Sequence, residues 1–217
     1  MKHSYPTLYL FNNVFFPQTI IPLTLSDKTS IELLRNCHEK DQNFVLYHPS
    51  EREKKVGTLG KIIAIEKQDD GSITALVQGL ARVKLISQEQ HLPYPLFLCE
   101  DLFDINNEVT FLDNSIERLH HVLASWLNRH VSSVKERERF MKDLNKPQKL
   151  INYLCMFMIK DNELKEILLE NTSLPERIRL LDALLKGKSP DTEDQDMGMA
   201  IKSFERMELN PNQKNAV

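Results

Sequence analysis

The stretch GTLGKIIAIEKQDDGSITALVQGLARV, residues 57–83, decides the fold of the first half of this 217-residue chain. Apolar side chains alternate along both of its arms, at Ile63, Ile65, Ile73, Ala75 and Val77. A period of two is typical of a β-strand with one buried face. Between the arms stands Asp69-Asp70-Gly71-Ser72, and an Asp-Gly step suits a tight turn that needs positive φ. The stretch therefore predicts an antiparallel hairpin.

Further strand patterns surround this hairpin. Gly79 interrupts the returning arm, which predicts a bulge or a sharp bend before the strand continues. Other short β-prone runs occupy residues 7–11, 43–47 and 95–100. Residues 14–23 contain two prolines that cannot donate to a ladder, so this part is expected to be edge-like or irregular. With one helix capped by Ser26 or Asp27, the first half is predicted to form a small curled sheet or barrel.

The second half of the chain changes to a helical period. Apolar residues recur every three or four positions from Val109 through Leu112 to His130, which predicts one long amphipathic helix. Pro147 suits the first turn of another helix, and Asp161 is a candidate cap for a third. The last helix is expected to open at a capping box, residues 173–176, and to end at Gly187. The pattern predicts a bundle of three or four helices.

The expected fold class is therefore α+β, a β-barrel followed by a helical bundle. The predicted limits are 1–104 for the barrel with its inserted helix and 105–188 for the bundle. Residues 189–217 are expected to be an acidic linker followed by a short helix or tail, because Ser189 to Asp194 is polar and acidic and residues 197–207 carry a short apolar pattern.

Composition excludes several classes of protein. A hydrophobic fraction of 41% supports a packed core, and a formal charge of -3 gives no long-range attraction to nucleic acid. Three cysteines, Cys37, Cys99 and Cys155, are odd in number and widely spaced, which fits reduced thiols in the cytoplasm. No signal peptide is expected, and no apolar run is long enough to cross a membrane. The predicted location is cytoplasmic.

No known catalytic or metal-binding motif is complete in the sequence. Gly187-Lys188-Ser189 ends like a P-loop, but Asp182 stands where the first glycine should be. His120 and His121 are adjacent, so on a helix they point about 100° apart and share a metal poorly. We expect no catalytic residues, no metal ligands and no cofactor, and we predict that the chain is not an enzyme.

Aromatic residues near the start of the chain are the best binding candidates. Phe15, Phe16, Pro17 and Tyr47 are the residues that we predict to bind extended peptide, because an exposed strand edge beside aromatics can capture unfolded chain. The alternative is that these aromatics belong to the core of the barrel. For Phe11 we expect the core.

Several segments, taken together, resemble the N-terminal domains of Lon proteases. Residues 8–17, LYLFNNVFFP, with Ile21-Pro22-Leu23 after them, are similar to the opening of that domain. Val56 to Ile62, Asp70 to Ser72 and Val77 to Val83 are similar to its next strand, hairpin and following segment. Order and spacing agree over roughly residues 5–186. The family usually has glycine where this chain has Gln18, and an aromatic and a glutamate where it has Thr24, Ser26 and Asp27.

The resemblance implies a PUA-like pseudo-barrel followed by a helical bundle. It also implies a non-catalytic module that recognises protein substrates or unfolded peptides, as an adaptor or substrate selector, with a Lon-type protease as a further candidate partner. Full-length Lon continues into an ATPase module and a protease module, so this chain is expected to be a stand-alone member. RNA binding by a PUA-like barrel, an uncharacterised enzyme, and self-association into a homo-oligomer stay open as alternatives.

Overall fold

The computed structural model describes residues 2–105, 114–144 and 146–186. Contacts divide the chain into two compact units, with the boundary between Leu102 and Phe103. A six-stranded sheet and six helices confirm the α+β class. The predicted domain limits stay a prediction, because compactness does not test whether a part folds alone. The predictions for residues 109 and 112, Gly187 and residues 189–217 fall outside the described residues.

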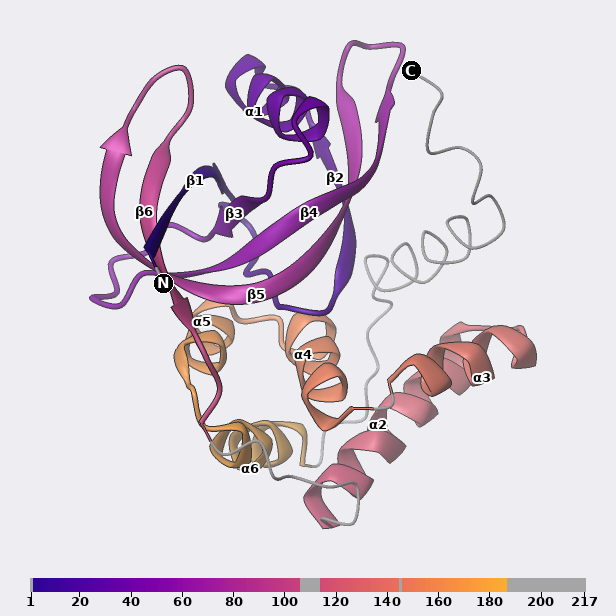
Figure 1. Ribbon diagram of the computed structural model, residues 1–217. Coiled ribbons are helices and arrows are strands. Elements are labelled where there is room, and N and C mark those ends of the chain that lie inside the picture. Colours follow the sequence, from indigo (N-terminus) through magenta and orange to yellow (C-terminus); the bar gives the residue numbers. More distant parts are fainter. Residues whose placement is uncertain (1, 106–113, 145, 187–217) are drawn as a thin grey trace. The chain divides into compact units, whose positions relative to one another are not determined.

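The first unit is a curled sheet with one helix (Figure 1). Its elements are β1 (Lys2–Tyr9), β2 (Ile20–Leu25), α1 (Lys28–Glu39), β3 (Phe44–Tyr47), β4 (Val56–Lys67), β5 (Ile73–Gln90) and β6 (Leu96–Leu102). The strand order is β2-β5-β4-β3-β1-β6, and β5 also pairs with β6. That extra pairing closes β5, β4, β3, β1 and β6 into a ring, which confirms the predicted barrel.

The hairpin of β4 and β5 forms as its turn chemistry predicts. Gly71 has a φ of 85°, where a side chain would be strained. The Asp70 carboxylate accepts hydrogen bonds from Ser72 N at 2.9 Å and from Ser72 Oγ at 2.6 Å. These bonds lower the pKa of Asp70. Further along, Leu59 pairs with Ala81 and Gly60 pairs with Gly79, so one residue bulges out beside Gly79 as predicted.

The interior of the barrel draws side chains from all five ring strands. Its buried residues are Val45, Tyr47, Leu59, Val83, Leu85, Phe97 and Cys99, with Tyr5 and Tyr9 of β1 packed against them. Of the two candidate caps for α1, the structure selects Asp27, whose carboxylate accepts from Ser30 N at 2.8 Å. The buried side of α1 is formed by Leu33, Leu34 and Cys37.

The described part of the second unit contains five helices where three or four were predicted. They are α2 (Asn114–His130), α3 (Val134–Asp143), α4 (Pro147–Met158), α5 (Asn162–Glu170) and α6 (Leu174–Leu185). Helix α3 was missed because only one of its residues, Phe140, is buried, so its sequence looks like a solvated run of charges. The predicted caps Asp161 and Ser173 are confirmed, as is Pro147 in the first turn of α4.

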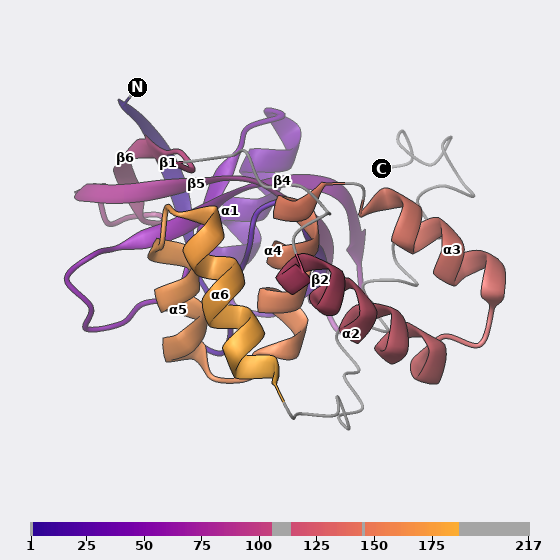
Figure 2. The same cartoon turned by 90° about the horizontal axis from the view of Figure 1, so that it is seen from below.

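A buried polar cluster joins three parts of this second unit, whose helices are seen from below in Figure 2. Arg177 of α6 is 1% exposed and donates to Asp104 Oδ1 at 2.6 Å and to Asn152 Oδ1 of α4 at 3.2 Å. Ile105 N donates to Thr172 O at 2.8 Å, which holds the segment next to Asp104 against the start of α6. The entry of the chain into the bundle is thereby fixed by both charge and backbone.

Candidate functional site

The four residues predicted to bind peptide lie in the interior of the first unit. Phe15 and Phe16 are 2% and 0% exposed, Tyr47 is 5% exposed, and Pro17 is buried. The expectation that these side chains are exposed is therefore wrong. Peptide contact by them stays a prediction, but it requires a change in the position of residues 14–17.

Hydroxyl groups hold this segment in the core. Thr58 Oγ1 of β4 donates to Phe15 O at 2.5 Å, and Thr19 Oγ1 donates to Phe16 O at 2.6 Å. Because each carbonyl has a partner, the segment can be buried without forming a strand. Residues 14–17 form no strand, and β2, which contains Pro22, pairs only with β5 among the described strands, at the end of the strand order, so the prediction of an edge-like or irregular segment is confirmed. The side chains of residues 14–17 are nevertheless buried.

Phe11, which was expected in the core, is 70% exposed, so that prediction is also wrong. Strand β1 ends at Tyr9, and the following residues leave the sheet, which places Phe11 beyond the last strand pairing. Its ring leans on Tyr9 with 6.2 Å between ring centroids, and Tyr9 lies 6.2 Å from Tyr47. We call Phe11, Tyr9 and Tyr47 the aromatic surface, which runs from an exposed ring to a buried one.

Backbone contacts fix the aromatic surface in place. Leu10 N donates to Tyr47 O at 2.8 Å, and His48 Nδ1 donates to Leu10 O at 2.7 Å. The strand ends that carry Tyr9 and Tyr47 are therefore locked together just where Phe11 leaves the sheet. Burial raises the pKa of Tyr9 above its ordinary value of 10.0. The surface offers the exposed ring of Phe11, which suits apolar and aromatic side chains.

The sequence contained a sign of this surface. Tyr9 and Phe11 are two residues apart and so project to the same side of an extended chain. Asn12-Asn13 follows at once as a turn, and a residue between a strand and a polar turn is commonly solvated. The apolar character of residues 7–11 favours the core, whereas the turn that follows favours exposure, and the structure agrees with the turn.

Other exposed apolar side chains occur elsewhere in the described residues. Leu92, at the turn between β5 and β6, is 81% exposed, and Val134 at the start of α3 is 57% exposed. Single exposed apolar residues are common on protein surfaces. Leu92 lies at the turn between β5 and β6 and is not one of the three residues of the aromatic surface, which makes it a suitable control position.

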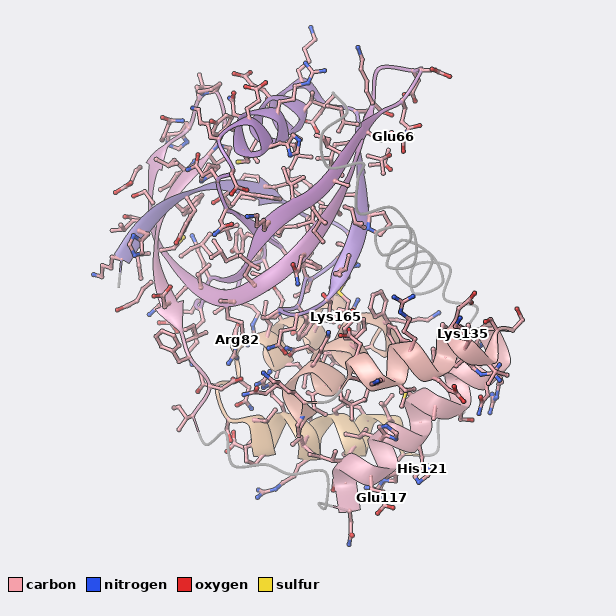
Figure 3. All side chains as sticks on the ribbon, turned by 45° about the vertical axis from the view of Figure 1, so that its right-hand side comes forward. Glu66, Arg82, Glu117, His121, Lys135 and Lys165 are labelled. Carbon is pink, nitrogen blue, oxygen red and sulfur yellow. The ribbon has the colours of Figure 1, made fainter. Side chains whose placement is uncertain are left out.

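Within residues 2–105, 114–144 and 146–186, no three histidine, cysteine or acidic side chains gather as metal ligands do. His120 and His121 of α2 have ring centroids 6.5 Å apart, and Figure 3 shows His121 on the same helix as Glu117. All three cysteines are free and buried. Burial raises the pKa of Cys37 to about 11 and those of Cys99 and Cys155 to about 12, which suppresses the reactive thiolate.

Comparison with known proteins identifies the family. The family described as ATP-dependent protease La (LON) substrate-binding domain matches residues 4–187. The chain belongs to the Lon substrate-binding domain family. Among solved structures, the N-terminal domain of Mycobacterium avium complex Lon protease superposes with a TM-score of 0.70 at 18% identity, covering 85% of this chain and 99% of that one. A Lon N-terminal domain protein from Xanthomonas campestris gives a TM-score of 0.61 at 18% identity.

Complete Lon proteases match over a fraction of their length. Lon protease of Rickettsia bellii is 25% identical over 88% of this chain but only 27% of its own length. Lon protease 2 of Desulfotalea psychrophila is 25% identical over 85% of this chain and 25% of its own length. The chain thus spans about a quarter of these relatives. Among its described helices, none combines the length and the hydropathy that a bilayer crossing needs.

Proposed function

We propose that this Lon substrate-binding domain recognises unfolded segments of other proteins through its aromatic surface and supplies no catalysis itself. The family places the chain among substrate-binding modules. The observation that carries the proposal is the position of Phe11, which is 70% exposed and rests on Tyr9. An exposed ring backed by a rigid aromatic neighbour offers a preformed contact for an apolar side chain of a client.

The role that follows is selection of substrates for proteolysis. The partner that we propose is a Lon-type protease, because the relatives join this kind of domain to a protease in one chain. The three free, buried cysteines fit work in a reducing compartment such as the cytoplasm. Incubation of the purified chain with ATP and an unfolded protein should produce no cleavage fragments. Fragments that persist after further purification would overturn the non-catalytic part of the proposal.

The test of recognition compares two exposed apolar residues of the same unit. Binding of a permanently unfolded, carboxymethylated protein is measured for the wild type, for Phe11→Ser and for Leu92→Ser. Truncating an aromatic anchor commonly costs about 2 kcal/mol of binding, roughly a thirtyfold loss of affinity. We expect that loss for Phe11→Ser and almost none for Leu92→Ser.

Circular dichroism should show that both variants keep the wild-type fold, since neither side chain is part of the core. Equal affinities for all three proteins would remove the aromatic surface from the proposal. An RNA titration run in parallel addresses the alternative of nucleic-acid binding, and saturable RNA binding without protein binding would replace the proposal.

A further inference from the structure

The chain between the aromatic surface and β2 combines a deeply buried centre with a strained end. We call residues 12–19 the strap. Its central residues Val14, Phe15, Phe16 and Pro17 are all buried. Gln18, by contrast, has a φ of 62°, a left-handed conformation that costs a residue with a side chain roughly 1–3 kcal/mol. The departure from glycine at this position therefore has an energetic consequence.

A second cost falls on the same residue. The Oε1 atom of Gln18 is buried without a hydrogen-bond partner among the described residues. An unsatisfied buried acceptor loses its solvation without compensation, so the closed strap is destabilised there a second time. The backbone of Gln18 is nevertheless held, because its N–H donates to Gly79 O at 2.9 Å.

Hydrogen bonds to Thr58 of β4 and Gly79 of β5, together with one from Thr19 itself, hold the strap. Gly79 N donates to Thr19 O at 2.9 Å, and the hydroxyls of Thr58 and Thr19 bind the two phenylalanine carbonyls. The backbone of Gly79 approaches so closely that a Cβ there would lie 2.5 Å from Phe16 O. No ladder of strand pairing holds residues 12–19, whereas β1 and β2 on either side are paired with neighbours.

We propose that the strap is a gate that opens from the barrel, exposes Phe15 and Phe16, and leaves a space that an extended client segment with adjacent large apolar side chains can fill. This inference rests on the proposed function and adds a second, latent part to the binding site. Burial of the apolar side chains favours the closed state. Two effects favour the open state. The strap regains conformational entropy, and Gln18 is relieved of its positive φ and of its buried, unpartnered Oε1.

The gate predicts how affinity responds to substitutions inside the strap. If the client binds the open form, its apparent dissociation constant is the intrinsic one divided by the open fraction. Gln18→Gly removes both local costs and keeps the strap closed. Thr19→Val removes the hydroxyl that binds Phe16 O and releases it. Thr19→Val loses one hydrogen bond and should raise the open fraction about fivefold, whereas Gln18→Gly removes two costs and should lower the open fraction by at least about fivefold.

The chain offers a matched control for each variant. Asp41 also has positive φ, 47°, but lies outside the strap, so Asp41→Gly relieves strain without acting on the gate. Thr7 is a buried threonine whose hydroxyl donates to Tyr5 O at 3.3 Å, so Thr7→Val removes a comparable hydrogen bond elsewhere. Both controls should change stability while leaving exchange in residues 12–19 and client affinity as in the wild type.

The experiment measures hydrogen exchange of residues 12–19 by mass spectrometry, together with the affinity for two probes. The probes are the carboxymethylated protein and a synthetic peptide with the sequence of residues 12–19, Asn-Asn-Val-Phe-Phe-Pro-Gln-Thr. Gln18→Gly should slow exchange and weaken binding of both probes by at least about fivefold. Thr19→Val should speed exchange and strengthen binding of both probes about fivefold.

Three outcomes would overturn the gate. Affinities that stay constant while exchange changes would mean that clients bind the closed form, which leaves the proposed function intact. Exchange of residues 12–19 only upon global unfolding would mean that the strap is not a separate element. A wild type that binds neither probe would remove the proposed function as well.

Discussion

The two compact units bury different kinds of polar group. In the barrel, the buried polar residues are mostly hydroxyls, Thr7, Thr19, Thr58 and Ser72, joined by Arg82. In the bundle they are Asn152, Lys165, Arg177 and Asp182. Short hydroxyl bonds to carbonyls let irregular backbone pack against strands, whereas buried charges must find partners across helices. The barrel should therefore respond most to added volume, and the bundle most to a lost charge.

The largest expected effect is the loss of the buried charge in the bundle. Arg177→Met removes the buried ion pair to Asp104 and deprives Asn152 of a donor. Removing one member of a buried pair costs about 3–5 kcal/mol. Urea denaturation followed by fluorescence of Trp126, the single tryptophan, which is buried in α2, reports on this unit.

The control for Arg177→Met is an ion pair on the surface of the barrel. Lys61 Nζ lies 2.9 Å from Asp41 Oδ1, and the two side chains are 44% and 81% exposed. Lys61→Met should change the unfolding free energy by less than about 1 kcal/mol. Similar losses for both variants would end the distinction between the units.

The second expected effect concerns volume in the barrel. An alanine at Gly79 would place its Cβ 2.5 Å from Phe16 O and 3.0 Å from the Cα of Pro17, both backbone atoms. Overpacking of this kind costs about 1–3 kcal/mol, and the strap should move outward. Urea denaturation followed by far-ultraviolet circular dichroism measures the loss. Gly71→Ala meets no atom within 4 Å and carries only the cost of its φ of 85°, about 1 kcal/mol.

If Gly71→Ala lowers the unfolding free energy more than Gly79→Ala does, the close contact between Gly79 and the strap leaves room for an added methyl group, and the overpacking argument is wrong. A variant Gly79→Ala that binds clients more tightly would agree with the gate, because the added methyl group pushes on Phe16 O from below the strap.

Local rules explain how far the fold could be predicted from the sequence. The Asp-Gly turn, the bulge beside Gly79 and the caps Asp161 and Ser173 are each fixed by a few neighbouring residues, and each was found. Helix α3 was missed because it buries only Phe140. Hydrophobic periodicity arises because one face of a helix is buried. A helix that is almost entirely exposed to solvent therefore shows little periodicity by which it could be predicted.

The candidate site was harder to predict, because exposure depends on tertiary structure. Phe11 and Phe16 are only five positions apart, yet one is 70% exposed and the other 0%. Thr58, which binds Phe15 O, is 43 residues away in sequence, so no local pattern announces that contact. The positive φ of Gln18 was equally hidden, because a glutamine gives no sequence signal of a left-handed backbone.

The smallest expected effect is a pH dependence of the unfolding free energy, which tests whether the two units unfold separately. The thiol of Cys155 has an ordinary pKa of 9.0, which burial raises to about 12 in the folded bundle, although Arg177 and Lys165 act in the opposite direction. Between these two values the folded protein keeps a proton that the unfolded chain has lost. Its unfolding free energy should therefore fall as the pH rises above 9, by about 1 kcal/mol per pH unit. Cys155→Ala should flatten this decline when Trp126 fluorescence is followed from pH 8.5 to 10.5.

Cys37 of α1 is the matched thiol of the first unit, with its pKa raised to about 11 by burial. If the two units unfold separately, Cys37→Ala leaves the alkaline decline of the Trp126 signal unchanged, because the bundle does not contain that thiol. If Cys37→Ala flattens it as much as Cys155→Ala does, barrel and bundle unfold as one cooperative body, and the contrast between their cores has no counterpart in their stability. A decline that neither variant alters would show that the thiols are not buried as the structure has them.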